Sequence, residues 1–480
     1  MNSSATSVGA RSAGNTPLVA TLLFIALVVA AIGSLGAPLI TAVAQDYQVS
    51  LGAAQWTLTI ALLSGAVATP LLGRLGSDRR RRPVVLVTLV TVVVGSVATV
   101  IPAPFAVLLA GRAVQGVGLG LTALMMATAR QHLGERAPGT IALLSVASTV
   151  GVGVGYPLAG LLAQIGGVRA AYLLGVVVAV AALIAAIVQL PRDAPPTSRD
   201  EAVDWMGAAL LSLGLVAILL VTSETALWTA HPFVAAAILT AGIAVLVGWV
   251  AVERQTPRPL VDLRALRHPA VAGANLIMGV SGIAMYMLFT LITRYVQTPP
   301  QSGYGYGLTE LEAGLVLVPF SLLGFLAGRV VPRLQQRLGP AALLTASGVV
   351  VAAGCCLFAA TRTSGVAWPV AAMGVLGFGV GGFSATMPQA ILAVTPAAET
   401  ASAMSVNQVV RSVGFSIGSA VSGFVLALYT PAGHFAPDGQ GYTTAAWAAT
   451  GLTVCSIAIA LALGSIQQRA TPPRPAVHAG

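Results

Sequence analysis

Charged residues are scarce in this chain. Only 8% of its 480 residues are charged, whereas 56% are hydrophobic and the mean hydropathy is +0.89. An average soluble domain carries about 25% charge. So little polar surface excludes a water-soluble globule, and the composition predicts a membrane protein.

Lysine is absent, and all 24 basic residues are arginine. A net charge of +10 would suggest a nucleic-acid partner in a soluble domain, but here the arginines lie in short breaks between long uncharged runs. That placement indicates lipid headgroups and membrane topology instead. We expect a lipid bilayer around the chain and no nucleic acid.

Cysteine and nucleotide-binding patterns are also nearly missing. Cys355 and Cys356 are adjacent and Cys455 is remote, so neither a structural disulfide nor metal-ligand spacing is expected. The phosphate-binding pattern GxxxxGK[ST] does not occur, which argues against ATP-driven transport by this chain alone. We expect no metal and no cofactor.

Acidic groups are absent from the predicted helix interiors. We place all 14 carboxylates and all five histidines in loops or at helix ends. A membrane-embedded enzyme would need such groups inside the bilayer, so we do not expect an enzyme. A proton carrier needs a group that titrates near neutral pH, which arginine does not do.

What the sequence does contain is a succession of uncharged runs, each longer than the roughly 20 residues that cross a bilayer. They are apolar on every side, unlike the alternating strands of a membrane barrel. We expect an all-α polytopic protein with fourteen transmembrane helices. These are 18–42, 53–73, 83–101, 104–128, 140–163, 170–190, 206–223, 232–252, 270–296, 312–332, 340–360, 366–394, 401–428 and 442–465.

The arginines predict the orientation. With the N-terminus inside, 19 arginines fall on the inner side against three outside, so both termini are expected in the cytoplasm of a multi-pass cell-membrane protein. No cleavable signal peptide is evident. We expect a tail at 1–17, a six-helix bundle at 18–190, a linker at 191–205, two extra helices at 206–253, a linker at 254–269, a second bundle at 270–465 and a tail at 466–480.

Internal similarity supports that division. The stretch from Gly73 is echoed from Gly328, and the glycine-rich stretch from Gln115 is echoed from Leu376. The offsets of 255 and 261 residues indicate one six-helix unit that occurs twice. The two helices between the copies have no counterpart, which gives a 6+2+6 arrangement.

Two predicted helices carry motifs. The fourth contains Arg112, Gln115 and Gly116, and burying an arginine there costs about 2.5 to 3.5 kcal/mol on insertion scales. Arg112 either serves the transport path or is a structural arginine bonded to neighbouring carbonyls. The fifth has small residues for close helix packing and a proline that favours a kink. It is read either as ordinary packing or as a gating bend, and its motif residues are Gly151, Gly155, Pro157 and Gly160.

Together these motifs resemble signatures of the major facilitator superfamily. They are Gly-x-Leu with an acid and an arginine run after the second helix, Arg-x-x-Gln-Gly in the fourth, and Gly-x-x-x-Gly-x-Pro-x-x-Gly in the fifth. VDWMG at 203–207 and the stretch from Glu253 are similar to the fourteen-helix drug:proton antiporter branch. The resemblance implies the major facilitator fold and a loop that latches the two halves. The gating residues it implies are Gly73, Arg74, Asp78, Arg81 and Arg82.

The chain departs from that pattern in two places. Ser77 holds the usual place of the loop acid, with Asp78 after it, and the first helix has Ser34 but no aspartate. Proton coupling is thus implied by the resemblance alone. Our candidate for it is Asp46 at the outer mouth, with a solvated loop acid as the alternative interpretation.

The deep arginines predict the substrate. Arg112 and Arg411 have no buried acid to neutralise them. A cavity that they shared would therefore be electropositive and would favour neutral or anionic amphiphiles. In the alternative interpretation, carbonyls and water accept the hydrogen bonds of both arginines away from any cavity. The cavity candidates are Ser34, Asn275, Tyr286, Asn407, Gln408 and Arg411. We therefore expect a secondary transporter for multidrug or metabolite efflux by alternating access, coupled to protons and monomeric. A carrier of other coupling or direction, or a sensor of the same fold, remains an alternative.

Overall fold

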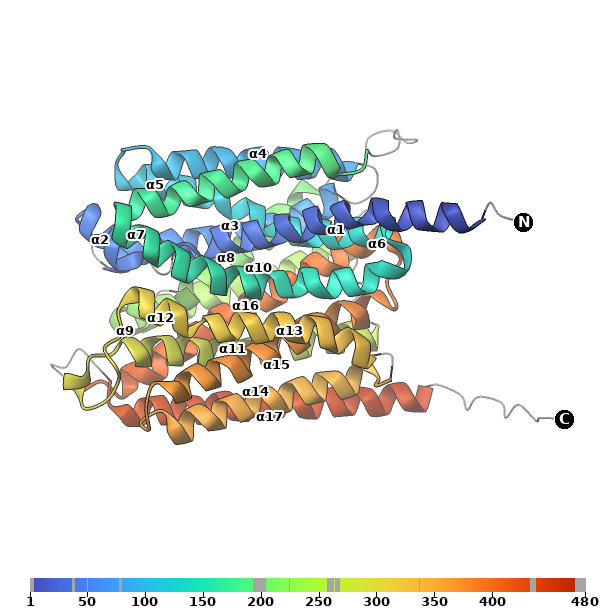
Figure 1. The fold of residues 1–480 in the computed structure, drawn as a ribbon. Helices are drawn as coiled ribbons and strands as arrows, with labels where there is room; N and C mark the ends of the chain where they lie inside the picture. The colour runs from blue at the N-terminus through green and yellow to red at the C-terminus, as the bar shows by residue number, and fades with distance from the viewer. Residues whose placement is uncertain are drawn as a thin grey trace.

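Long helices dominate the structure, a computed structural model. It describes residues 4–36, 39–49, 51–76, 80–192, 204–223, 225–256, 263, 268–335, 337–431 and 437–470, and no strand occurs among them. Twelve of the described helices are long and apolar enough to cross a membrane by length and composition. α1 begins and α17 ends at the same end of the bundle, which we call the terminal face (Figure 1). The other end is the distal face.

The first half of the chain forms one group of packed helices, in which α7 contacts both α1 and α4. Its elements are α1 Ser4–Ser34, α2 Ile40–Asp46, α3 Leu51–Leu75, α4 Arg81–Val100, α5 Phe105–Gly116, η2 Val117–Gly120, α6 Leu121–His132, η3 Gly134–Arg136 and α7 Ala137–Gln189.

α7 is a continuous assignment that contains a break. Gly166 (φ −138°, ψ 18°) and Gly167 (φ 71°, ψ −175°) leave helical geometry, and the second value suits glycine because it has no Cβ. The chain reverses direction there and returns to the terminal face beside α4 (Figure 1). The break falls between the predicted helices 140–163 and 170–190.

The predicted first helix, 18–42, is interrupted. α1 ends at Ser34, a turn follows at Leu35 and Gly36, and α2 is a separate short helix. Gly36 would place a Cβ only 3.1 Å from the backbone of Leu58, so α3 crosses closely at this point. The apolar run continues through the break, which is why hydropathy alone merges the two elements.

A helical hairpin lies against both halves. Its elements are α8 Trp205–Ser223, α9 Thr225–Ala230 and α10 Pro232–Gln255. α8 packs on α3 and on α16, while α10 packs mainly on α8. The seam to α16 is apolar: Leu211, Leu215 and Trp249 meet a row of valines that includes Val409.

The last part of the chain forms the second group. Its elements are α11 Pro269–Gln297, η5 Pro300–Ser302, α12 Glu310–Val316, α13 Val318–Gln335, α14 Pro340–Thr361, α15 Ala367–Leu392, η6 Ala397–Glu399, α16 Thr400–Leu428 and α17 Gly439–Ala470. α13, α14 and α15 pack on one another, as do α11, α16 and α17. α7 contacts α13 across the gap between the groups.

A tyrosine cluster fixes the distal loop that joins α11 to α12. The ring of buried Tyr295 lies 5.6 Å from Tyr304, 5.6 Å from Phe358 and 5.2 Å from Tyr442. The Tyr304 hydroxyl donates to the Pro437 carbonyl. Burial raises the pKa of Tyr304 well above its usual range, so it remains a neutral donor. The cluster therefore ties the loop to the ends of α11, α14 and α17.

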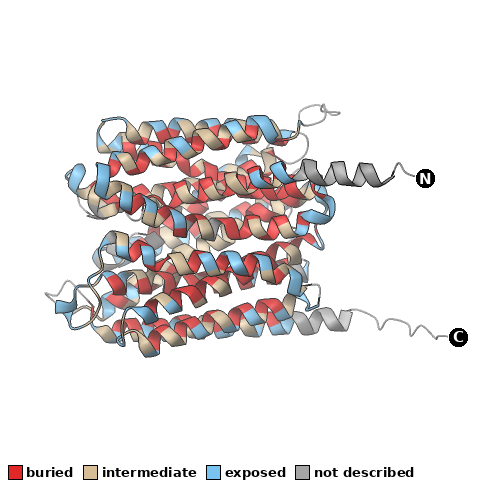
Figure 2. Cartoon of the chain, in the orientation of Figure 1, coloured by how far each residue is buried: buried red, intermediate tan, exposed pale blue. Residues whose placement is uncertain are grey.

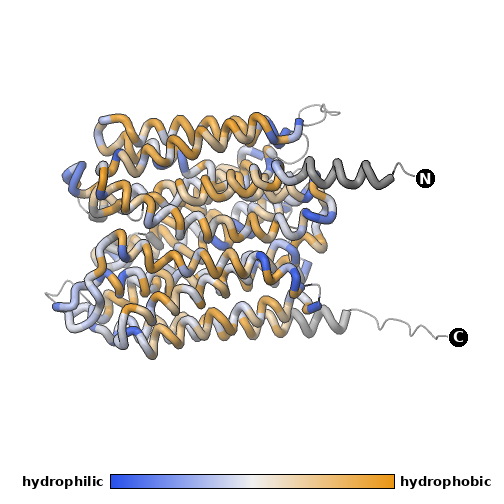
Figure 3. Tube along the Cα trace, viewed as in Figure 1, coloured by the Kyte–Doolittle hydropathy of each residue, from blue (hydrophilic) through white to orange (hydrophobic). Residues whose placement is uncertain are grey.

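Apolar side chains cover the outside of the bundle as well as its core. Exposed valines such as Val87, Val94 and Val177 line the outward faces of α4 and α7. Figure 2 shows exposed positions along the outside of the bundle, and Figure 3 shows the helices as hydrophobic along most of their length. Water would not tolerate so much exposed apolar surface, whereas lipid chains would.

Candidate functional site

A cavity lies between the two groups of helices, about halfway along their length. It has a volume of about 170 Å³ and is lined from both sides. The first group contributes Ala30, Gly33, Ser34, Leu58, Leu62, Gly65, Ala66, Thr69, Leu119, Thr122 and Tyr156. The second contributes Met278, Met285, Tyr286, Phe289, Phe320, Val380, Ser384, Gln408, Arg411, Ser412 and Phe415. Both halves would therefore contact any molecule bound here.

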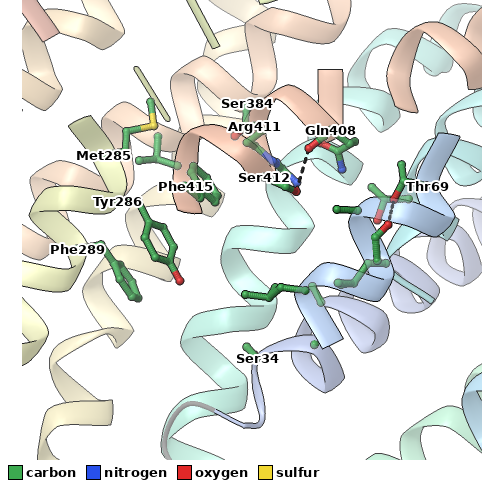
Figure 4. A pocket seen from close by; sticks show the side chains of 18 of the residues that line it. Ser34, Thr69, Met285, Tyr286, Phe289, Ser384, Gln408, Arg411, Ser412 and Phe415 are labelled. Atoms are coloured by element: carbon green, nitrogen blue, oxygen red, sulfur yellow. Dashed lines mark hydrogen bonds between the residues drawn. The ribbon is translucent and has the colours of Figure 1, made fainter. Parts of the chain in front are cut away.

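Arg411 carries the charge of this cavity: no other described lining residue is ionised at neutral pH. It is the twelfth residue of α16, about 17 Å along the helix axis from its start. Its guanidinium lies 5.9 Å from the ring centre of Phe415, and within the described chain it makes no side-chain hydrogen bond or ion pair. Figure 4 shows it beside Gln408 and Ser412. A half-buried cation without a counterion makes the cavity attractive to anions.

Aromatic rings form one wall of the cavity. Tyr286 stacks on Phe289 and on Phe415, with ring centres 5.4 and 5.0 Å apart. Phe320 meets Phe289 edge to face at 5.5 Å. All four come from the second group, and Figure 4 shows Phe289, Tyr286 and Phe415 in a row. The facing wall from the first group is mainly small or aliphatic.

The structure separates the predicted cavity residues into two sets. Ser34, Tyr286, Gln408 and Arg411 line the cavity. Asn275 and Asn407 are not among its lining residues; they are buried and bond to each other, Nδ2 of Asn407 donating to Oδ1 of Asn275 at 3.1 Å. This pair joins α16 to α11 and leaves both amides occupied.

Arg112, the other deep arginine, is fully buried outside the described lining of the cavity. It donates to the carbonyls of Thr57 (2.8 Å), Ile32 (2.8 Å) and Gly33 (3.1 Å), and to Oε1 of Gln115 (2.7 Å). The carbonyls of Ile32 and Gly33 belong to the last turn of α1, where the negative end of the helix dipole attracts a cation. The Ile32 carbonyl also accepts from the Leu35 amide at 3.3 Å. This geometry corresponds to the structural interpretation of Arg112.

The glycines of both motifs bring helix backbones together. A Cβ at Gly116 would lie 2.1 Å from the Ala61 carbonyl oxygen, so α5 and α3 touch. Cβ atoms at Gly151 and Gly155 would meet α1, the first at 2.7 Å from Ala30. Gly160 is buried. These contacts fit the packing interpretation of the fifth-helix motif.

The opposite face of that motif reaches the second group. A Cβ at Gly153 would clash with Ser321 of α13, and one at Gly314 of α12 would lie 3.1 Å from the Cα of Pro157. The glycine-rich part of α7 is therefore held between α1 and the second group. The sequence motif did not single out Gly153.

The end of α3 and the start of α4, which flank the predicted gating loop, lie at the terminal face (Figure 1). Asp78 falls outside the described residues. Gly73 brings α3 against α16, since a Cβ there would lie 2.1 Å from Oγ of Ser405. Arg81 is buried and donates to Gln131 at 2.5 Å, and Arg82 donates to the Ile187 carbonyl at 3.0 Å. Arg74, at the end of α3, is partly buried.

Arg130, which the sequence interpretation did not select, bonds across the two groups. From the last turn of α6 it donates to Oγ1 of Thr400 (2.8 Å) and to the carbonyls of Leu392 (3.0 Å) and Thr395 (2.7 Å). Gln389 adds a second crossing bond, to the Pro138 carbonyl at 2.7 Å. Arg81 bonds to Gln131, the chain neighbour of Arg130 in the last turn of α6. We call the Arg130 bonds the terminal clamp.

Removing the terminal clamp should separate the two groups at this face. We expect Arg130→Gln to raise the ratio of separated to joined conformations about tenfold, equal to about 1.4 kcal/mol, because it removes charge-assisted bonds. The measurement is the distance distribution between spin labels on cysteines introduced at Glu135 and Ala397, in a background without native cysteines. Arg337→Gln, at an exposed arginine of the same face, is the control. An unchanged distribution in Arg130→Gln would contradict a clamp.

The remaining candidate, Asp46, is exposed at the end of α2 on the distal side. It does not line the cavity. In the described part of the chain, no cluster of three or more His, Cys, Asp or Glu side chains could hold a metal ion.

Comparison with known proteins gives relatives along most of the chain. A multidrug resistance protein B homolog of Mycobacterium tuberculosis is 29% identical over 396 residues, covering 79% of this chain and 70% of its own. The tetracenomycin C resistance and export protein of Streptomyces glaucescens is 26% identical, with coverages of 80% and 71%. The probable actinorhodin transporter of Streptomyces coelicolor is 29% identical, with coverages of 80% and 67%.

Solved structures and family models agree with this result. The human organic anion transporter MFSD10 superposes with a TM-score of 0.63 at 16% identity, covering 92% of this chain and 99% of that protein. The nucleoside transporter NupG gives 0.56 at 15% identity, with coverages of 93% and 99%. These two likenesses concern the fold. The family model described as Major Facilitator Superfamily matches residues 22–419, and the chain belongs to that family of multi-span membrane transporters.

Proposed function

We propose that this protein exports small amphiphilic molecules by alternating access. The observation that carries the proposal is the central cavity, lined by both groups of helices and holding Arg411 without a described counterion. The relatives named for multidrug resistance and for tetracenomycin C export support the direction and the substrate range.

We propose fourteen membrane spans in a 6+2+6 arrangement. Twelve candidate spans are the starting point. Dividing α7 at Gly166 and Gly167 gives a thirteenth span, and α8 is the fourteenth. The 53 residues of α7 would extend about 80 Å, far beyond a core of about 30 Å, so two spans fit and one does not. The excess of arginine near the terminal face favours a cytoplasmic location for it. Spans 18–190 and 270–465 then form the two halves, with 206–253 between them.

In this mechanism the halves rotate about the cavity. The terminal clamp and the close contact at Gly73 join them on the cytoplasmic side, and these contacts open when the cavity faces the cytoplasm. Substrate binding to both walls couples occupancy to the rotation. Arg112 and Gln115 hold α1, α3 and α5 together, so the first half moves as one body.

The charge of Arg411 favours anionic or neutral substrates over cations, and the family resemblance favours proton exchange. Purified protein in liposomes with an acidic lumen should therefore accumulate a permanently charged sulfonated dye, and a protonophore should abolish the accumulation. A quaternary ammonium dye should accumulate less. Liposomes without protein are the control. Equal transport with and without the gradient would contradict proton exchange, and no transport of either dye would contradict an exporter.

Asp46 is tested in the same assay. Because its side chain is exposed and lies outside the cavity lining, we expect Asp46→Asn to retain gradient-driven transport. That result would remove Asp46 from the coupling step.

A further inference from the structure

We propose that the preferred substrate class is a small aromatic acid, bound with its anionic group at Arg411 and its ring against the wall formed by Phe415, Tyr286, Phe289 and Phe320. We call these four rings the aromatic wall. The inference rests on the proposed function, because it assigns the ligand of the same cavity. It is carried by the placement of the charge beside the rings.

The charge defines one end of the ligand. Arg411 has no hydrogen-bonding or ionic partner in the described chain, although an arginine this deep is expensive to leave without one. A carboxylate or sulfonate can accept two bonds from one guanidinium. Gln408, one turn earlier on the same side of α16, lines the cavity next to it and adds an amide donor. A cation would instead meet repulsion with no described acid to offset it.

The rings define the other end. Phe415 lies one turn beyond Arg411, with its ring centre 5.9 Å from the guanidinium carbon. Phe415, Tyr286 and Phe289 are nearly parallel, with interplanar angles of 20° and 21° between neighbours. An anionic group on Arg411 thus places the ligand's attached ring within contact of this wall. Aromatic pairs gain stabilisation beyond the buried area, which a saturated ring does not supply.

Size narrows the class further. A cavity of about 150 Å³ holds a benzene molecule, and this one measures about 170 Å³. In this conformation it therefore accommodates about one ring with its acid group. The opposite wall is mainly small or aliphatic, and its polar groups are the neutral hydroxyls of Ser34, Thr69, Thr122 and Tyr156. Recognition of the charge therefore falls on the second group, and the first group closes over the ligand.

A matched ligand series tests the assignment by calorimetry on the full chain in detergent. Benzoate has the charge and the ring, benzamide lacks the charge, and cyclohexanecarboxylate lacks the aromaticity. We expect benzoate to bind about tenfold more tightly than benzamide and about threefold to tenfold more tightly than cyclohexanecarboxylate. Equal binding of benzoate and either comparison ligand would overturn the proposal.

A variant locates the ring preference. Phe415→Leu should bring benzoate and cyclohexanecarboxylate to equal affinity while benzoate remains preferred over benzamide. Phe424→Leu makes the same substitution on the same helix at an exposed position outside the described lining, so both preferences should persist. A ring preference that survives in Phe415→Leu would remove the aromatic wall from recognition. The series on the unmodified protein tests the proposal even where the variant does not fold.

The test separates the two levels of inference. Dye transport without benzoate binding would support the exporter and contradict the assignment of an aromatic acid as its substrate. Benzoate binding without transport of either dye would support the binding site and contradict the exporter.

Discussion

Arg411→Gln is expected to reduce transport of a sulfonated dye at least tenfold while transport of a neutral amphiphile changes little. The substitution removes the described charge of the cavity, and a charge-assisted hydrogen bond contributes about 1.5 to 3 kcal/mol. Arg411→Lys should retain part of the activity, since it keeps the charge but loses the bidentate geometry. The measurement is initial flux into proteoliposomes that contain equal amounts of folded protein.

The stability of Arg411→Gln should remain close to that of the unmodified protein, because Arg411 gives up no described hydrogen bond. A fall in the transport of the sulfonated dye and of the neutral amphiphile by the same factor would show that Arg411 does not select for charge. It would then act in the conformational cycle instead.

The same substitution at Arg112 should lower the stability of the protein, unlike the substitution at Arg411. Arg112→Gln removes the bonds donated to carbonyls at the end of α1 and on α3, in a part of the bundle where water cannot replace them. A hydrogen bond from a charged group contributes about 1.5 to 3 kcal/mol, so losing several of them removes a large share of the stability of most proteins. We expect a large drop in the melting temperature and in the yield of folded protein.

Thermal unfolding followed by tryptophan fluorescence in detergent measures this effect. The melting temperature of Arg112→Lys should fall between those of the unmodified protein and Arg112→Gln. One ammonium can reach some of the carbonyls but lacks the planar set of donors of a guanidinium. A stable Arg112→Gln protein with specific loss of dye transport would restore Arg112 to the transport path.

The different roles of Arg112 and Arg411 could not be predicted from the sequence. Each is a lone arginine in an apolar helix, so burial cost and position predict both equally well. Their roles differ because α1 ends at Ser34 and offers its last carbonyls to Arg112, whereas nothing described faces Arg411 in that way. The end of α1 lies inside an unbroken apolar run, and hydropathy does not reveal it.

Other parts were predictable for physical reasons. The apolar runs predicted an all-helical membrane protein, because the bilayer sets a minimum length and forbids unpaired backbone groups. At Gly116, Gly151 and Gly155 a Cβ would meet a neighbouring helix, and glycine is the residue type that permits such an approach. The Asn275 and Asn407 pair and the terminal clamp depend on side chains far apart in sequence, and a single chain without relatives carries no signal for such pairs. Arg130 could have been suspected only from its place in the last turn of a spanning helix.

The α8–α10 hairpin makes the two sides of the molecule that face the membrane different. Because α8 lies on α3 and α16 together, it covers one of the two lines along which the halves meet. The other line, between α7 and α13, has no such cover among the described elements. A hydrophobic compound dissolved in the membrane would thus find one sideways approach to the interior, whereas the two groups of helices without the hairpin would offer two.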